Sequence, residues 1–194
     1  MLAPADPAGC PPRICLIGET GSGKSTTAEV LRQLLAAAGR PAELIPLAGL
    51  LRDLQNVLYQ RIGAVKAPDQ QDQRLMVDLA GNIRRIRPTA LVEDFERALA
   101  ALPAGTVAVN ADLRDHEVDA VRLRELGFLF VRIRCDRAVR AARLRLRDDL
   151  SVVDDERVFQ LDRIGCDLEF DNSRDGLHHV RDFCTGLVSG AVCC

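Results

Sequence analysis

Residues 13–25 read RICLIGETGSGKS, and this stretch decides the fold. Its first part, Arg13–Ile17, is a short apolar run that ends at a glycine, which is typical of a buried strand. The rest fits the pattern G-x-x-x-x-G-K-S/T, in which glycines let the backbone turn its amide groups inward. An amphipathic helical pattern follows from Lys24 to Ala38. A strand, a glycine-rich turn and a helix in this order predict a phosphate-binding loop (P-loop).

The loop supplies the groups that a nucleoside triphosphate with magnesium requires. Its amides form a nest for anionic oxygens, and the helix that follows adds its positive end. We expect Lys24 to reach the β- and γ-phosphates, Ser25 to offer its hydroxyl to magnesium, and Thr26 to touch the α-phosphate. The expected nucleotide-binding residues of the loop are Gly18, Thr20, Gly21, Ser22, Gly23, Lys24, Ser25 and Thr26.

The composition fits one domain with an aliphatic core. The chain has 194 residues, of which 47% are hydrophobic, with no Trp and one Tyr. A formal net charge of -2 argues against a general polyanion binder, so no nucleic-acid partner is expected. No apolar stretch reaches transmembrane length and no signal peptide is evident, so we expect no membrane partner and a cytoplasmic location. The seven cysteines show no metal-ligand spacing, and reduced thiols are the default.

Strand-like and helix-like segments alternate along the chain. Further apolar runs predict strands at residues 42–47, 106–110, 128–133 and 168–170. Helical patterns lie between them at residues 50–58, 75–86, 89–101, 115–126 and 136–147, with one more after the last strand. This alternation predicts a parallel sheet covered on both faces. Residues 1–12 and 189–194 are expected to be disordered tails of one domain that spans residues 13–188.

A P-loop needs a partner carboxylate for the metal or its waters. Asp112 follows the apolar strand 106–110, at the end of the sheet that opens onto the ligand crevice. We therefore expect Asp112 to serve magnesium and Arg114, two residues later, to meet a phosphate. The alternative is that Asp112 is only a helix cap or a turn residue, although Asp115 can cap that helix instead.

Three further segments have a distinctive order and spacing. They are residues 110–117 (NADLRDHE), Leu161-Asp162 and residues 167–172 (DLEFDN). Together with the P-loop they make the chain resemble the nucleoside monophosphate kinase-like group, most of all phage-type deoxynucleoside monophosphate kinases. Phosphomevalonate kinases of the same style are more distant. The resemblance covers most of residues 13–187 and implies a three-layer α/β/α P-loop NTPase fold, with five parallel strands in the order 2-3-1-4-5.

The resemblance also implies a lid at about residues 136–155 that closes arginines over the phosphates. The matching positions Arg137, Arg140 and Arg143 share one helix face, and such charges neutralise the transferring phosphoryl group. The alternative is a solvated basic face paired with Asp148 and Asp149.

Two further regions receive roles from the resemblance. Helices at about residues 48–101 would hold the acceptor, and Asn172 to Asp175 would lie near the adenine ring. No Asp directly follows the second strand, where many small-molecule kinases place a base, and a phosphate acceptor needs none because its oxygen is already anionic. Candidates to hold the acceptor phosphate are Arg52, Arg74, Arg84, Arg85 and Arg87.

The sequence thus predicts an ATP- and Mg2+-dependent phosphotransferase. We expect it to move the γ-phosphate of ATP to a small phosphorylated acceptor, a nucleoside or deoxynucleoside monophosphate, with catalytic groups at Lys24, Asp112, Arg114, Arg137 and Arg140. One alternative is a kinase of a non-nucleotide metabolite. Another is a nucleotide-dependent switch or ATPase that acts on a protein partner. The oligomeric state, including a homodimer, is left open.

Overall fold

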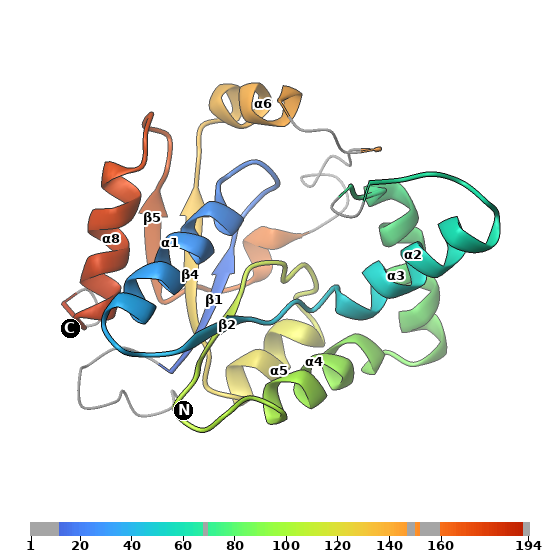
Figure 1. Cartoon of the computed structure of the whole chain (residues 1–194), viewed down its shortest axis with the longest axis horizontal. Coiled ribbons are helices and arrows are strands. Elements are labelled where there is room, and N and C mark those ends of the chain that lie inside the picture. Colours follow the sequence, from blue (N-terminus) through green and yellow to red (C-terminus); the bar gives the residue numbers. More distant parts are fainter. Residues whose placement is uncertain (1–11, 68–69, 147–149, 152–159, 192–194) are drawn as a thin grey trace.

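A computed structural model of the chain describes residues 12–67, 70–146, 150–151 and 160–191. Its centre is a five-stranded sheet in the order β2-β3-β1-β4-β5, and every neighbouring pair of strands is parallel (Figure 1). The predicted fold class and strand order are confirmed. The strands are β1 (Arg13–Ile17), β2 (Ala42–Leu44), β3 (Val107–Asn110), β4 (Leu129–Arg134) and β5 (Leu168–Asp171).

Strand β1 lies in the middle of the sheet and faces two separate cores. Ile14 and Leu16 pack into the cluster on one face, whereas Cys15 and Ile17 pack into the cluster on the other. All four side chains are fully buried. A strand covered on both faces needs apolar residues at every position, which explains why this segment does not alternate.

Helices cover the two faces of the sheet and a third group extends beyond its edge. On one face lie α1 (Lys24–Ala37) and α8 (His178–Val188), which share the core of Ile14 and Leu16. On the other lie α4 (Ala90–Ala100) and α5 (Asp119–Glu125). The helices α2 (Gly49–Arg61) and α3 (Gln73–Ile86) project to one side, as Figure 1 shows. Leu51, Met76 and Leu91 form a small separate core that joins α2, α3 and α4.

Two short helices complete the described structure. Helix α6 (Arg137–Arg145) follows β4 and lies above the loop between β1 and α1 (Figure 1). A 3-10 turn, η1 (Leu161–Arg163), precedes β5 and buries Leu161. None of the helices in the part of the chain that the structure describes is both long and apolar enough to cross a membrane.

Some element bounds differ from the sequence expectation, for local reasons. The predicted second strand 42–47 ends at Leu44, although the amide of Ile45 still donates to the carbonyl of Val109 at 2.8 Å. Pro46 then has no amide to continue the pairing. Helix α5 begins one turn later than predicted, because the Asp115 carboxylate accepts hydrogen bonds from the amides of Val118 and Asp119 and caps it there. The predicted tails lie outside the described residues except for Pro12 and residues 189–191.

Candidate active site

The P-loop backbone depends on glycines at three positions. Gly18, Gly21 and Gly23 have positive φ angles of 148°, 84° and 99°, which other residues rarely adopt. A Cβ on Gly23 would lie 2.1 Å from the Asn172 side-chain nitrogen, and one on Gly18 would lie 2.4 Å from the Ile133 carbonyl oxygen. The loop is therefore held against β4 and β5 as well as against its own helix, and only glycine fits at these two points.

Two cations meet on the carbonyl oxygen of Gly18. Lys24 Nζ donates to the carbonyls of Gly18 and Glu19 at 2.7 and 2.8 Å. The Arg114 guanidinium donates to the same Gly18 carbonyl at 3.0 Å and to the Thr20 hydroxyl at 3.2 Å. Lys24 and Arg114 both line the cavity described below. The structure thus concentrates positive charge at the loop, as binding a polyphosphate requires.

The other predicted loop residues take different positions. Ser25 is exposed in the first turn of α1 and lines the cavity, whereas Thr26 is exposed but lies outside the lining. Ser22 is fully buried. In the described part of the chain, no group of three or more His, Cys, Asp or Glu side chains could hold a metal ion. An oxygen pair from Ser25 and Asp112 in one cavity fits magnesium, which keeps waters and phosphate oxygens as its remaining ligands.

Asp112 joins the end of β3 to the start of α2. Its carboxylate accepts hydrogen bonds from the amides of Leu47 and Ala48 at 2.8 and 3.3 Å, and from the Asn110 side-chain amide at 2.8 Å. Arg52 donates a further hydrogen bond at 3.2 Å. Asp115, and not Asp112, accepts hydrogen bonds from the first amides of α5, so the alternative that remains for Asp112 is that of a turn residue. The role of Asp112 toward magnesium stays a prediction.

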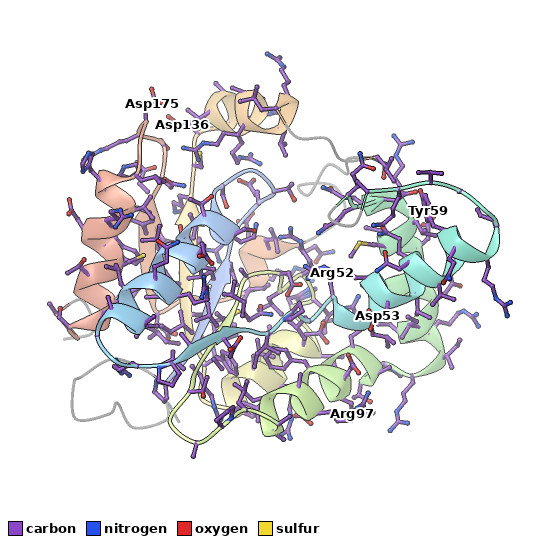
Figure 2. All side chains as sticks on the ribbon, viewed as in Figure 1. Arg52, Asp53, Tyr59, Arg97, Asp136 and Asp175 are labelled. Atoms are coloured by element: carbon purple, nitrogen blue, oxygen red, sulfur yellow. The ribbon has the colours of Figure 1, made fainter. Side chains whose placement is uncertain are left out.

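One cavity of about 610 Å³ connects the P-loop to the helices α2, α3 and α4. It opens beyond the carboxyl ends of β1 and β3, which is where parallel sheets bind their ligands. Of the predicted acceptor arginines, Arg52 and Arg84 line it, and Arg74, Arg85 and Arg87 do not. Figure 2 shows Arg52 between the sheet and the α2–α3 pair, with Asp53 turned to the outside of the same helix.

The three predicted lid arginines have separate environments. Arg140 forms an ion pair with Glu19 of the P-loop at 3.1 Å, and its side chain is 11% exposed. Arg143 donates to the carbonyls of Asn172 and Arg174, whereas Arg137 is exposed. None of the three lines the cavity as the described residues define it. The alternative partners Asp148 and Asp149 lie outside the described residues.

Asn172 is buried beside the P-loop rather than on the cavity surface. Its side-chain nitrogen donates to the Ser22 carbonyl at 2.7 Å, and its side-chain oxygen lies 2.9 Å from His179 Nε2. Asn172 therefore supports the shape of the loop without lining the cavity. A contact with adenine, which the resemblance implied for residues 172–175, stays a prediction.

Sequence reasoning missed three polar residues on the cavity wall. Asp115, His116 and Asp119 line the cavity directly after Asp112 and Arg114. Asp119 forms a 2.6 Å ion pair with Arg84 although it is 1% exposed. The pattern Asp-x-x-x-Asp after the strand does not reveal the partner in α3, so the sequence predicts only a capping role for Asp115.

Comparison with known proteins supports the architecture. No protein-family model and no curated protein matches the sequence. The APS kinase CysC of Mycobacterium tuberculosis, solved with AMPPNP and APS, aligns with a TM-score of 0.53 and 16% identity over 93% of this chain and 96% of that chain. TT1252 of Thermus thermophilus aligns with a TM-score of 0.51 and 16% identity, over 91% and 96% of the two chains.

A shikimate kinase from Acinetobacter baumannii in complex with shikimate aligns with a TM-score of 0.49 and 16% identity, over 94% and 93% of the chains. At such identities a structural likeness establishes a fold and nothing finer. The strand order and the likeness to APS kinase show that this chain has the fold of P-loop kinases. The narrower resemblance to nucleoside monophosphate kinases stays a prediction.

Proposed function

We propose that this chain is an ATP- and Mg2+-dependent phosphotransferase that moves the γ-phosphate of ATP to a nucleoside or deoxynucleoside monophosphate. One observation carries the proposal: the same cavity is lined by Lys24 and Ser25 of the P-loop and by Arg52 and Arg84 of α2 and α3. Groups suited to a phosphate donor and groups suited to an anionic acceptor therefore face one space, as direct transfer requires.

The donor side is formed by the P-loop. Its inward amides and Lys24 hold the β- and γ-phosphates, and Arg114 adds a second charge beside Gly18. Ser25 and Asp112 are the residues that would hold magnesium. When bound, that ion would neutralise phosphate oxygens during transfer.

The acceptor side is formed by α2 and α3. Arg52 is placed by its hydrogen bond to Asp112, so its charge lies next to the expected metal carboxylate and within the cavity. An acceptor phosphate bound there brings an oxygen that is already anionic. No general base is needed, in keeping with the absence of an Asp at the end of β2.

The chain has a segment suited to excluding water from the transfer. Helix α6 packs on the P-loop, since a Cβ on Gly21 would lie 3.1 Å from the Arg140 carbonyl oxygen. In this proposal residues 13–188 form one kinase-like domain in which residues 48–101 hold the acceptor and residues 136–155 form the lid. Arg137 and Arg140 then act on the phosphates when the lid closes.

The test is ADP release from ATP and magnesium with a panel of acceptors. The panel contains ribo- and deoxyribonucleoside monophosphates, a phosphorylated alcohol, adenylyl sulfate and shikimate. Stimulation by a mononucleotide that is lost in Lys24→Ala and kept in Lys66→Ala supports the proposal. Stimulation only by a non-nucleotide acceptor, or only by a protein fraction, would replace it with one of the two alternatives.

A further inference from the structure

Four polar side chains form a wall of the cavity between α3 and the start of α5. They are Arg84, Asp115, His116 and Asp119, and all four line the cavity; they are called the α3–α5 wall below. Arg84 Nη2 donates to Asp119 Oδ2 at 2.6 Å, and Arg84 Nε lies 3.8 Å from Asp115 Oδ2. Two carboxylates thus face one guanidinium.

A purely structural ion pair explains only part of this wall. Arg84 does link α3 to α5, which helps to fix the helices that project from the sheet. However, Asp119 Oδ1 and Arg84 Nε are both buried and have no hydrogen-bond partner within the described residues. Asp119 as a whole is 1% exposed. An acceptor atom and a donor atom are therefore left unpaired at the same place, where a ligand that supplies both partners would be favoured.

The rest of the cavity sets the direction in which such a ligand would lie. Lys24, Arg52 and Arg114 place positive charge at the P-loop and α2 side of the cavity. Met76, Val77 and Leu91 supply apolar lining between the helices. A ligand with an anionic group at one end, a flat apolar body and a hydrogen-bonding edge at the other end would match all three surfaces.

We propose that the α3–α5 wall recognises the base of the acceptor nucleotide and favours bases that carry an exocyclic amino group. This inference rests on the proposed function and narrows its acceptor. The amino group donates to Asp119 or Asp115, and the neighbouring ring nitrogen or carbonyl oxygen accepts from Arg84. Adenine, cytosine and guanine each offer such a donor beside an acceptor.

Uracil and thymine match the wall less well. Their ring N–H could donate to a carboxylate while one neighbouring carbonyl accepts from Arg84, but the carbonyl on the other side of that N–H would then be turned toward a carboxylate with no proton between them. A hydrogen-bonding mismatch of this kind lowers kcat/KM by about tenfold or more.

The first experiment compares kcat/KM for dAMP, dCMP, dGMP, dTMP and dUMP with ATP and magnesium. We expect at least one amino-bearing acceptor to exceed dTMP and dUMP by about tenfold. Equal or better use of dTMP or dUMP overturns the inference while leaving the proposed function in place. If neither these five nor the corresponding ribonucleoside monophosphates stimulate ADP release, both the proposed function and the inference are wrong.

The second experiment changes the wall itself. In Asp119→Asn one carboxylate oxygen, which accepts hydrogen bonds, is replaced by an amide nitrogen, which donates them. The preference for the best amino-bearing nucleotide over dTMP should therefore fall about tenfold or more. The kcat/KM for dTMP should stay within about twofold of the parent value or rise. Calorimetric titration of the same acceptors, with a non-hydrolysable ATP analogue present, should show the same change in Kd.

The matched control is Asp182→Asn, an identical chemical change on the exposed side of α8. It should leave the acceptor preference unchanged. An equal loss for all five acceptors in Asp119→Asn, or no change at all, would identify the wall as a structural ion pair. Should that variant fail to fold, Asp115→Asn tests the same point, because the Asp115 side chain is 20% exposed and lines the same wall.

Discussion

The side-chain amide of Asn172 donates to the carbonyl of Ser22 at 2.7 Å and thereby ties the end of β5 to the P-loop, 150 residues earlier in the chain. His179 of α8 lies 2.9 Å from the other end of that amide. Gly23 has no side chain at the point where Asn172 approaches it. The shape of the phosphate-binding loop therefore depends on a residue that the sequence places far from it.

The first prediction follows from this contact. Asn172→Ala leaves the Ser22 carbonyl without its partner, and an unpaired buried group costs about 1–3 kcal/mol. We expect a lower melting temperature and ATP binding weaker by about tenfold, measured by thermal unfolding and by calorimetric titration. Asp175→Asn, on the exposed turn beyond β5 (Figure 2), is the control and should change neither quantity. Normal ATP affinity in Asn172→Ala would show that the loop keeps its shape unaided.

Lys24 gives the second prediction, and the chain has a ready control because Lys66 is its only other lysine. Lys24 is 6% exposed and donates to carbonyls of the P-loop, whereas Lys66 lies outside the loop and donates to the carbonyl of its neighbour Ala67. Lys24→Ala should lower phosphoryl transfer about a hundredfold or more, since it removes a charge directed at the transition state. Lys66→Ala should transfer at the parent rate. Equal rates for both variants would mean that the loop is only structural.

Asp112 is the subject of the third prediction, which the structure changes. From the sequence alone, Asp112→Asn should lower the rate with little effect on stability. In the structure its two carboxylate oxygens accept hydrogen bonds from the amides of Leu47 and Ala48, whereas an Asn side chain has one acceptor oxygen and a nitrogen that only donates. We therefore expect a steep loss of rate together with a loss of about 1–3 kcal/mol in the free energy of unfolding.

The measurements for Asp112→Asn are steady-state kinetics across magnesium concentrations and urea unfolding. Asp53→Asn, on the exposed side of the same α2 helix, is the control (Figure 2). A loss of stability with unchanged specific activity would assign Asp112 to the β3–α2 connection alone.

The sequence predicted the part of this molecule that is encoded locally. The run Ile14–Ile17, the glycine pattern and the amphipathic helix after it lie next to one another, so β1, the P-loop and α1 were all expected. The strand order followed from the resemblance. Contacts between distant segments were not predictable in this way. Asp112 with Leu47 and Arg84 with Asp119 join residues 65 and 35 positions apart, and no local pattern specifies such pairs.

The fourth prediction concerns the contribution of Asp119 to the pH dependence of stability. Burial raises the pKa of its carboxyl above the ordinary value, with Asp115 and Asp112 adding to the rise and Arg84 partly opposing it. A raised folded-state pKa means that the folded protein holds this proton more tightly than the unfolded chain does. Its stabilising contribution is full below about pH 4 and is lost as the pH rises through the folded-state value.

Asp119→Asn removes this titration, so its melting temperature relative to the parent should rise as the pH increases from about 4. For Glu29→Gln, the melting temperature relative to the parent should change with pH in the opposite direction. Hydrogen bonds from Arg32 and Gln33 lower the pKa of Glu29 to about 2, so that variant should lose stability relative to the parent as the pH rises from about 2. If the melting temperatures of the parent and of Asp119→Asn differ by the same amount at every pH between about 4 and 8, the raised pKa of Asp119 is contradicted.

The last prediction concerns the contact between Arg140 of α6 and Glu19 of the P-loop. Their ion pair at 3.1 Å holds Arg140 at the loop. A bound triphosphate brings more negative charge to the same place, so Arg140 can exchange a carboxylate for phosphate oxygens. Transfer has to exclude water, which makes closure matter most when both substrates are bound. Arg140→Ala should therefore lower the rate of transfer about a hundredfold while changing ATP affinity by less than about tenfold.

Two measurements decide whether α6 is a lid. Hydrogen exchange of residues 137–145 should slow when a non-hydrolysable ATP analogue and an acceptor bind together, and should slow less with either one alone. Arg145→Ala, exposed at the end of the same helix, is the control and should transfer phosphate normally. If exchange in α6 is indifferent to both ligands and Arg140→Ala transfers normally, then Arg140 only anchors α6 to Glu19. Water would in that case have to be excluded by another part of the chain, because the P-loop alone leaves Ser25 exposed to solvent.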